Sequence, residues 1–297
     1  MSLMNVAFEI VMVFFLAVSL PIYVIFIRAL IKYRQTDFKS PFYLLCISLG
    51  CVDLVAALHN NAFIKLRKWG WFHEQFDLLE PIPSKVGFLI GFSCFFAQTI
   101  AVALMTLNRY VIVVHPHKHP KIWTPKFVAL CTAFQWTFSV IVCLPTVKFN
   151  YRWVYLNDSS VRLIYSDYEF ATSSFKAISY ITVATSVVLS VFYTRMFAFS
   201  YLEKRRIRPE PGNTGHVRVL NEIELRLCVS GFFIFCGLVQ LSIAFLLISH
   251  RGDFLSHYYL WSFATEFFTL SNPYIVFLCS KPVRTRMLMI MFCAKSS

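Results

Sequence analysis

Residues 86–108 read VGFLIGFSCFFAQTIAVALMTLN, and this stretch decides the fold. Its 23 consecutive residues include no Asp, Glu, Lys or Arg. At about 1.5 Å per residue, a helix of this length crosses a hydrocarbon core about 30 Å thick. The run therefore indicates a membrane-spanning helix. Arg109 is the first charge after it, and it either extends to the lipid head groups or is held by polar partners inside a helix bundle.

The composition of the whole chain is also typical of a membrane protein. Of its 297 residues, 58% are hydrophobic and 14% are charged, and 32 are phenylalanine. Such a chain has too few polar side chains to cover its surface in water. Further apolar segments surround the first, so that the full set lies at residues 6–30, 42–64, 86–108, 127–147, 175–199, 225–249 and 257–280. The sequence therefore predicts an all-α, seven-transmembrane helix bundle formed by one domain, residues 1–297.

The positions of the basic residues predict how this bundle lies in the membrane. The C-terminal tail and the connections after the first, third and fifth segments, with the helix ends beside them, hold 19 of the 28 Lys and Arg residues. Basic residues concentrate on the cytoplasmic side of membrane proteins. We therefore expect the N-terminus outside and the C-terminus inside. Nucleic-acid binding is not predicted, because it requires a continuous basic surface and this charge is divided among short loops.

Two modification sites follow from this orientation. Asn157 begins an Asn-Asp-Ser triplet on the predicted outer side, where N-glycosylation takes place. Residues 282–293 place basic side chains ahead of an apolar run, which is typical of a short helix lying in the membrane interface against lipid. Cys293 closes that helix and is the candidate site for palmitoylation.

Neither a metal centre nor an enzyme active site is predicted. The three histidines in HPHKHP at 115–120 alternate with residues that include two prolines, and this pattern is typical of a turn. Three acidic residues in the apolar segments, Glu9, Asp53 and Glu266, do not form paired catalytic groups at one depth of the membrane. We therefore expect no cofactor and no enzymatic activity.

Three motifs occur in an order that resembles the rhodopsin-like G-protein-coupled receptors. The sequence NRY at 108–110, followed by His-Pro, resembles the Asp-Arg-Tyr box at the inner end of that family's third helix. The stretch LLCISLGCVDLVAAL at 44–58 resembles the second helix around its buried aspartate, and SNPYIVF at 271–277 resembles the seventh-helix Asn-Pro motif. The corresponding residues are Asn108, Arg109, Tyr110, Asp53, Asn272 and Pro273. The phenylalanine-rich composition, the short tails and the Asn-Arg-Tyr variant resemble the nematode serpentine chemoreceptors of the class gamma and class V kind.

The resemblance implies a multi-pass receptor of the plasma membrane, in the cilia of sensory neurons, that binds an unknown external small molecule and activates a heterotrimeric G protein. Arg109 would exchange helix partners for a G-protein helix, and Asn108 cannot form the salt bridge that an aspartate would. Asp53 and Asn272 would form a switch linked to sodium or to water. Gln98 stands where the family often has a small hydroxyl, and a purely structural hydrogen bond at Asp53 is the remaining alternative.

The ligand pocket is expected in the outer half of the bundle. Glu266 lies seven residues before Pro273, two helical turns toward the outside, where it either contacts the ligand or tunes the polarity of the pocket, or else forms a structural hydrogen bond or ion pair. The candidate ion-pair partners are Lys176 and Arg162. Residues on other helices that would face Glu266 are Gly91, Phe95 and Gln240.

The alternatives to a chemoreceptor are an amine receptor and a channel or transporter. Gly91 falls at the third-helix position that usually holds the aspartate of amine receptors, which argues against that class by the same resemblance. A multi-span channel or transporter is the alternative function. It would carry ions or solutes without a G protein.

Overall fold

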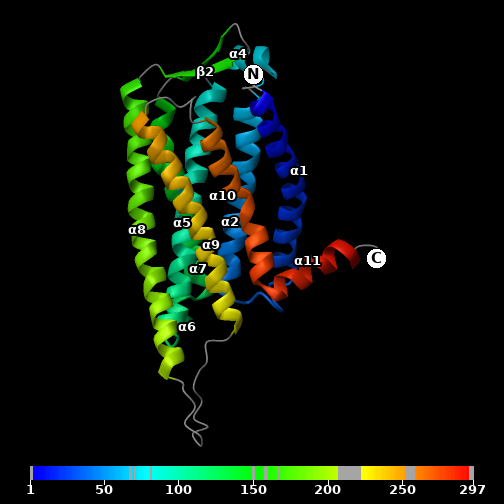
Figure 1. Cartoon of the computed structure of the whole chain (residues 1–297), viewed down its shortest axis with the longest axis vertical. Coiled ribbons are helices and arrows are strands. Elements are labelled where there is room, and N and C mark those ends of the chain that lie inside the picture. Colours follow the sequence, from blue (N-terminus) through cyan, green and yellow to red (C-terminus); the bar gives the residue numbers. More distant parts are fainter. Residues whose placement is uncertain are drawn as a thin grey trace, which may run out of the picture.

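Seven long helices lie side by side in the computed structural model, which describes residues 3–66, 69, 71–80, 82–148, 151–156, 160–165, 168–206, 222–251 and 258–293 (Figure 1). They are α1 (Leu3–Lys32), α2 (Pro41–His59), α5 (Ile82–Val114), α7 (Pro125–Cys143), α8 (Tyr168–Arg206), α9 (Glu222–Arg251) and α10 (Tyr258–Cys279). The first six of these, with the short helical segments that continue α2 and α7, provide spans of 22 to 33 residues that are apolar enough to cross a membrane. With its 22 residues, α10 extends about 33 Å. The predicted seven-helix transmembrane fold is confirmed.

Shorter elements complete these helices and connect them. A π-helical segment (Asn60–Lys65) continues α2, and a 3-10 segment (Leu144–Lys148) continues α7. The other short elements are α4 (His73–Leu79), α6 (His119–Ile122), α11 (Lys281–Cys293) and the antiparallel strands β1 (Tyr151–Leu156) and β2 (Ser160–Tyr165). The hairpin stands where the sequence analysis placed only a connection. Its YRWVYL and SVRLIY segments are rich in the aromatic and β-branched residues that favour strands.

The two ends of the bundle carry different elements (Figure 1). The N-terminus, α4 and β2 lie together at one end, which we call the hairpin end. At the opposite end lies α6, and α11 leaves α10 there and turns away from the bundle axis. We call this the α6 end.

Local sequence signals explain where two of the helices begin. Thr124 is an extended N-cap whose hydroxyl accepts a hydrogen bond from the Phe127 backbone N–H at 3.3 Å, and Pro125 follows as the first helical residue of α7. At α2, Pro41 likewise follows an extended N-cap, Ser40. Proline at this position loses no helical hydrogen bond, because the first N–H groups of a helix have no partner within it.

The helix α5 runs through the middle of the bundle and contacts α2, α7, α8 and α9. A chain of hydrogen bonds ties it to α2 and α7. Trp136 Nε1 donates to Ser48 Oγ at 3.3 Å, and Ser48 Oγ donates to Gln135 Oε1 at 2.9 Å. Gln135 Nε2 then donates to the Ala97 carbonyl at 3.1 Å. Because α5 is central, polar residues along it face the interior of the bundle and not lipid.

Candidate functional site

Arg109 lies inside the bundle at the α6 end. The helix α5 continues past it to Val114, and only 1% of the Arg109 surface is exposed. Its guanidinium carbon lies 3.9 Å from the centre of the Phe42 ring of α2, so the ring face covers the charge. Of the two expectations for this arginine, the structure therefore supports the one in which the bundle holds it.

Two buried tyrosines join further helices in this part of the bundle. Tyr193 of α8 lies with its hydroxyl 3.3 Å from Thr106 Oγ1 of α5, which donates to it, and a Cβ added at Gly231 of α9 would come within 2.9 Å of the same hydroxyl. Tyr43, the neighbour of Phe42 on α2, lies with its hydroxyl 3.4 Å from Ser280 Oγ, just after α10. These contacts connect α5 with α8 and α9, and α2 with the end of α10.

Asn108 connects Arg109 to α6. The Asn108 side chain is fully buried, and its Nδ2 lies 3.1 Å from Nε2 of His119. Burial lowers the pKa of His119, and the positive charge of Arg109 lowers that pKa further. A neutral imidazole ring can accept the Asn108 amide hydrogen at Nε2. Tyr110, the third residue of the motif, instead packs edge-on against Phe192 of α8, with ring centres 4.9 Å apart.

Asp53 lies deeper in the bundle, where three helices donate hydrogen bonds to its carboxylate. Tyr23 Oη of α1 donates to Oδ2 at 2.5 Å, and Asn272 Nδ2 of α10 donates to the same oxygen at 3.1 Å. Gln98 Nε2 of α5 donates to Oδ1 at 2.7 Å. With 1% of its surface exposed, Asp53 depends on these donors.

The donors around Asp53 also bear on the question of a sodium ion. A hard cation requires several oxygen ligands, whereas Tyr23, Gln98 and Asn272 present O–H and N–H groups to this carboxylate. In this structure the Asp53 carboxylate accepts hydrogen bonds from all three of these residues.

Pro273 explains why Tyr23 belongs to this cluster. Proline has no N–H, so the carbonyl four residues earlier in its helix, that of Thr269, is left without its helical donor. Tyr23 Oη lies 3.1 Å from that carbonyl and donates to it. The sequence analysis did not single out Tyr23. The sequence does contain one signal for it. Pro273 leaves a backbone carbonyl in the seventh segment without a donor, and Tyr23 in the first segment is a polar aromatic residue that can supply one.

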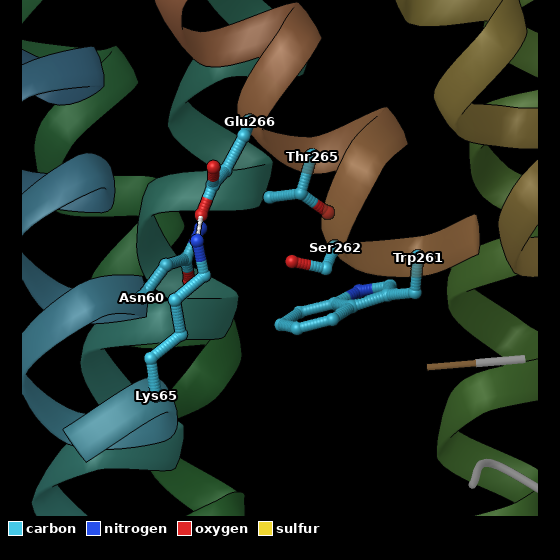
Figure 2. Close-up of a pocket in the computed structure, with 6 residues that line it drawn as sticks. All are labelled: Asn60, Lys65, Trp261, Ser262, Thr265 and Glu266. Atoms are coloured by element: carbon cyan, nitrogen blue, oxygen red, sulfur yellow. Dashed lines mark ion pairs between the residues drawn. The ribbon is translucent and has the colours of Figure 1, made fainter. Parts of the chain in front are cut away.

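Glu266 forms an ion pair with Lys65 in the half of the bundle nearer the hairpin end (Figure 2). Each side chain is only 2% exposed. The pair borders a narrow pocket that is also lined by Asn60, Trp261, Ser262 and Thr265.

Lys65 was not among the two partners expected for Glu266 from the sequence. Lys176 is exposed on α8, and the side chain of Arg162 lies outside the described residues. The sequence predicts that the second apolar segment ends at residue 64, one residue before Lys65. The π-helical turn instead carries Lys65 along the bundle as the last residue of the α2 span.

The other three residues expected around the pocket do not join Glu266. Gly91 packs against His59, whose Cε1 would lie 2.8 Å from an added Cβ. Phe95 packs against Phe245, with ring centres 4.8 Å apart. Gln240 borders a separate cavity of about 290 Å³ together with Cys236, Val239, Ile243, Ala244, Leu247 and Leu260. Among the described residues, each of the four candidates therefore has a different set of contacts.

The two predicted modification sites lie at the margins of the described structure. Asn157 falls between β1 and β2, outside the described residues. Cys293 is the last residue of α11, and its side chain is also outside them.

An ion pair between Arg286 and Asp37 joins α11 to the connection between α1 and α2.

Most of the chain is similar in sequence to known chemoreceptors. The model of the family described as "Serpentine type 7TM GPCR chemoreceptor Srv" matches residues 12–293. Serpentine receptor class V-1 of Caenorhabditis elegans is 23% identical over 275 residues, which cover 90% of this chain and 84% of the relative. Serpentine receptor class X-43 of the same nematode is 23% identical over 267 residues, which cover 85% and 77%. Human olfactory receptor 2M3 is 27% identical over 135 residues, which cover 42% and 40%.

Proposed function

Because this chain belongs to the Srv family of serpentine-type seven-transmembrane G-protein-coupled chemoreceptors, we propose that it binds an external small molecule near Lys65 and Glu266 and activates a heterotrimeric G protein through Arg109. The family is one of receptors and supports a chemosensory role. The alternative of a multi-span channel or transporter is not favoured.

One observation carries this proposal, namely the burial of Arg109 at the α6 end. A guanidinium is never neutral in a protein and needs acceptors or ring faces in every state it adopts. In this structure the Phe42 ring of α2 covers it, and the nearby hydrogen bonds of Tyr193 and Tyr43 connect α5 to α8 and α2 to the end of α10. Displacing one of those helices would free Arg109 for a partner outside the bundle. A ligand shifts the receptor toward that state only if it binds that state more tightly.

The orientation of the bundle is part of the proposal. The α6 end carries the basic residues Lys118, Lys121 and Arg284, and basic residues concentrate on the cytoplasmic side. The hairpin end then faces outward and exposes the Lys65–Glu266 half of the bundle to external chemicals. We assign the receptor to the plasma membrane, and family resemblance points to sensory cilia. Cys293 would be palmitoylated at the cytoplasmic lipid surface.

The proposal is tested by nucleotide exchange on purified G proteins. The receptor is reconstituted in lipid nanodiscs with one member of each Gα class, Gβγ and labelled GTP analogue, and compounds from a volatile and a water-soluble panel are added. We expect at least one Gα to exchange nucleotide faster than with empty nanodiscs, with further acceleration by an active compound. Exchange no faster than with empty discs for every Gα, together with ion current in bilayers, would instead support the channel alternative.

Asn108→Asp is expected to lower basal G-protein activation. The new carboxylate lies beside Arg109 and gives the guanidinium an ionic partner that Asn108 does not provide, which stabilises the resting state. The measurement is nucleotide exchange without ligand. Asn108→Leu has a similar volume and removes the His119 contact without adding charge, so it serves as the control and should not lower basal exchange. Equal or higher basal exchange in Asn108→Asp would argue against an ionic restraint at this position.

Asn157→Gln is expected to remove a glycan-sized mass from receptor expressed in a glycosylating cell, because the proposed orientation places this triplet outside. The gel shift should be reproduced by Ser159→Ala, which destroys the same acceptor triplet. Asn213→Gln serves as the control, since Asn213 starts no Asn-x-Ser/Thr triplet and lies on the proposed cytoplasmic side. An unchanged mass in both Asn157→Gln and Ser159→Ala would leave the orientation without this support.

A further inference from the structure

The ion pair between Lys65 and Glu266 has the properties of an exchangeable ligand site. We propose that this receptor recognises an unbranched primary ammonium ligand, whose charged group replaces the Lys65 ammonium at Glu266. The inference rests on the proposed function, which places the external ligand in this half of the bundle. It adds the chemical class of the ligand and the side chain that the ligand displaces. The proposed acceptor is Glu266 of α10, and not the third-helix position used by the amine receptors, which Gly91 occupies in this chain.

The ligand must take over volume that a side chain now fills. Lys65 and Glu266 are each 2% exposed, and the pocket they border is too narrow in this structure to hold a water molecule (Figure 2). Figure 2 shows the lysine stem reaching along one side of this pocket to the carboxylate, with Trp261, Ser262 and Thr265 on the other side. A ligand that binds here therefore enters as one of the two charged side chains leaves.

The two side chains differ in where they could go. Lys65 is the last residue of the α2 span, and its four-carbon stem can carry the ammonium outward to water at the hairpin end. Glu266 lies within α10 on a short side chain and has no such route. An anionic ligand that captured Lys65 would leave Glu266 buried without a counterion, which is strongly unfavourable. A cationic ligand leaves Glu266 paired and moves Lys65 into water.

The other groups that line the pocket also favour a cation. The indole of Trp261 borders the pocket, and aromatic faces attract cations. Thr265 Oγ1 has no hydrogen-bond partner among the described side chains and is available to accept an ammonium hydrogen.

The shape of the ligand follows from the volume that Lys65 vacates. A lysine side chain is an unbranched chain of four carbons that ends in an ammonium group. n-Butylammonium has the same length, charge and hydrogen-bond donors. It is therefore the probe for the site, and 1-butanol is the uncharged control of the same length.

The test measures binding to purified receptor by thermal unfolding. A thiol-reactive dye reports unfolding, because Cys46, Cys94 and Cys143 are buried in the folded chain. We expect n-butylammonium to raise the unfolding temperature of the wild-type receptor in a saturable way, and 1-butanol not to do so. Lys65→Ala should lower the half-saturating concentration at least about tenfold, because the competing ammonium is gone. Glu266→Gln should raise it at least about tenfold, because the ligand loses its charged acceptor.

The opposite signs of these two variants distinguish a ligand site from a structural ion pair. Lys65→Gln combined with Glu266→Gln leaves neither charge unpaired, so it should fold if a single variant does not, and it should not respond to n-butylammonium. Lys176→Ala, at an exposed position of α8, is the control and should respond like wild type. Stabilisation of Lys65→Ala but not of the wild type would overturn the proposal, and so would equal stabilisation by 1-butanol.

Binding and coupling are measured separately, so their failures can be distinguished. The thermal measurement contains no G protein. If nucleotide exchange is catalysed but n-butylammonium does not bind, only the ligand class is wrong. If n-butylammonium binds as expected but no Gα exchanges nucleotide, the proposed coupling is wrong and the ammonium site stands.

Discussion

Arg109→Ala is expected to reduce ligand-stimulated nucleotide exchange to the level of receptor-free membranes while the receptor still reaches the cell surface. Arg109 is a buried charge at the α6 end, and the proposed active state requires its guanidinium to leave the Phe42 ring for a G-protein helix. Alanine removes the group that both states use. Exchange is measured in membranes that contain equal amounts of surface receptor.

Arg109→Lys is the matched control for this prediction. It keeps the positive charge and the apolar stem but loses the planar, five-donor guanidinium. We expect partial exchange activity, between those of wild type and Arg109→Ala. Full signalling by Arg109→Ala would remove Arg109 from the coupling mechanism. Equal loss of surface receptor in both variants would show that the residue is needed for folding.

Asp53→Ala is expected to destabilise the receptor more than any other single change considered. It removes the acceptor of three buried donors, Tyr23 Oη, Gln98 Nε2 and Asn272 Nδ2, which come from three different helices. Tyr23 Oη and Gln98 Nε2 keep Thr269 as a second acceptor, whereas Asn272 Nδ2 loses the acceptor that it has here, and one unsatisfied buried donor costs about 1–3 kcal/mol. Proteins are stable by only about 5–15 kcal/mol. We therefore expect a large fall in the unfolding temperature and in surface receptor.

Two further variants identify the cause of that loss. Asp53→Asn retains one carbonyl acceptor in the same place, so it should destabilise the receptor less than Asp53→Ala. Thr137→Ala removes a hydroxyl at an exposed position of α7, where it bonds only to its own helix, and should change the unfolding temperature little. If Asp53→Ala unfolds at the wild-type temperature, the hydrogen bonds around Asp53 do not hold the four helices together.

The candidate site could be predicted only in part. Asp53 and Glu266 are visible in the sequence because an acidic residue in a long apolar run is costly unless it is satisfied. Their partners are not visible in this way, since Tyr23 and Gln98 are ordinary residues within apolar segments and Lys65 lies one residue beyond the predicted end of another. The sequence placed Gly91, Phe95 and Gln240 around Glu266 from helix register alone. In the structure His59 packs against Gly91, and Gln240 borders another cavity.

By itself the sequence determined that the chain is a seven-helix membrane protein and that Arg109 follows directly on an uncharged run. Both follow from the free-energy cost of placing charged side chains and backbone groups without hydrogen bonds in hydrocarbon. A stretch of about 20 residues is enough to show this cost in the sequence. Only the tertiary structure decided that Phe42 covers Arg109, that Tyr23 donates to Asp53 and that Lys65 pairs with Glu266. These contacts join residues far apart in the chain. Their register depends on how the helices pack and on one π-helical turn, neither of which the apolar runs encode.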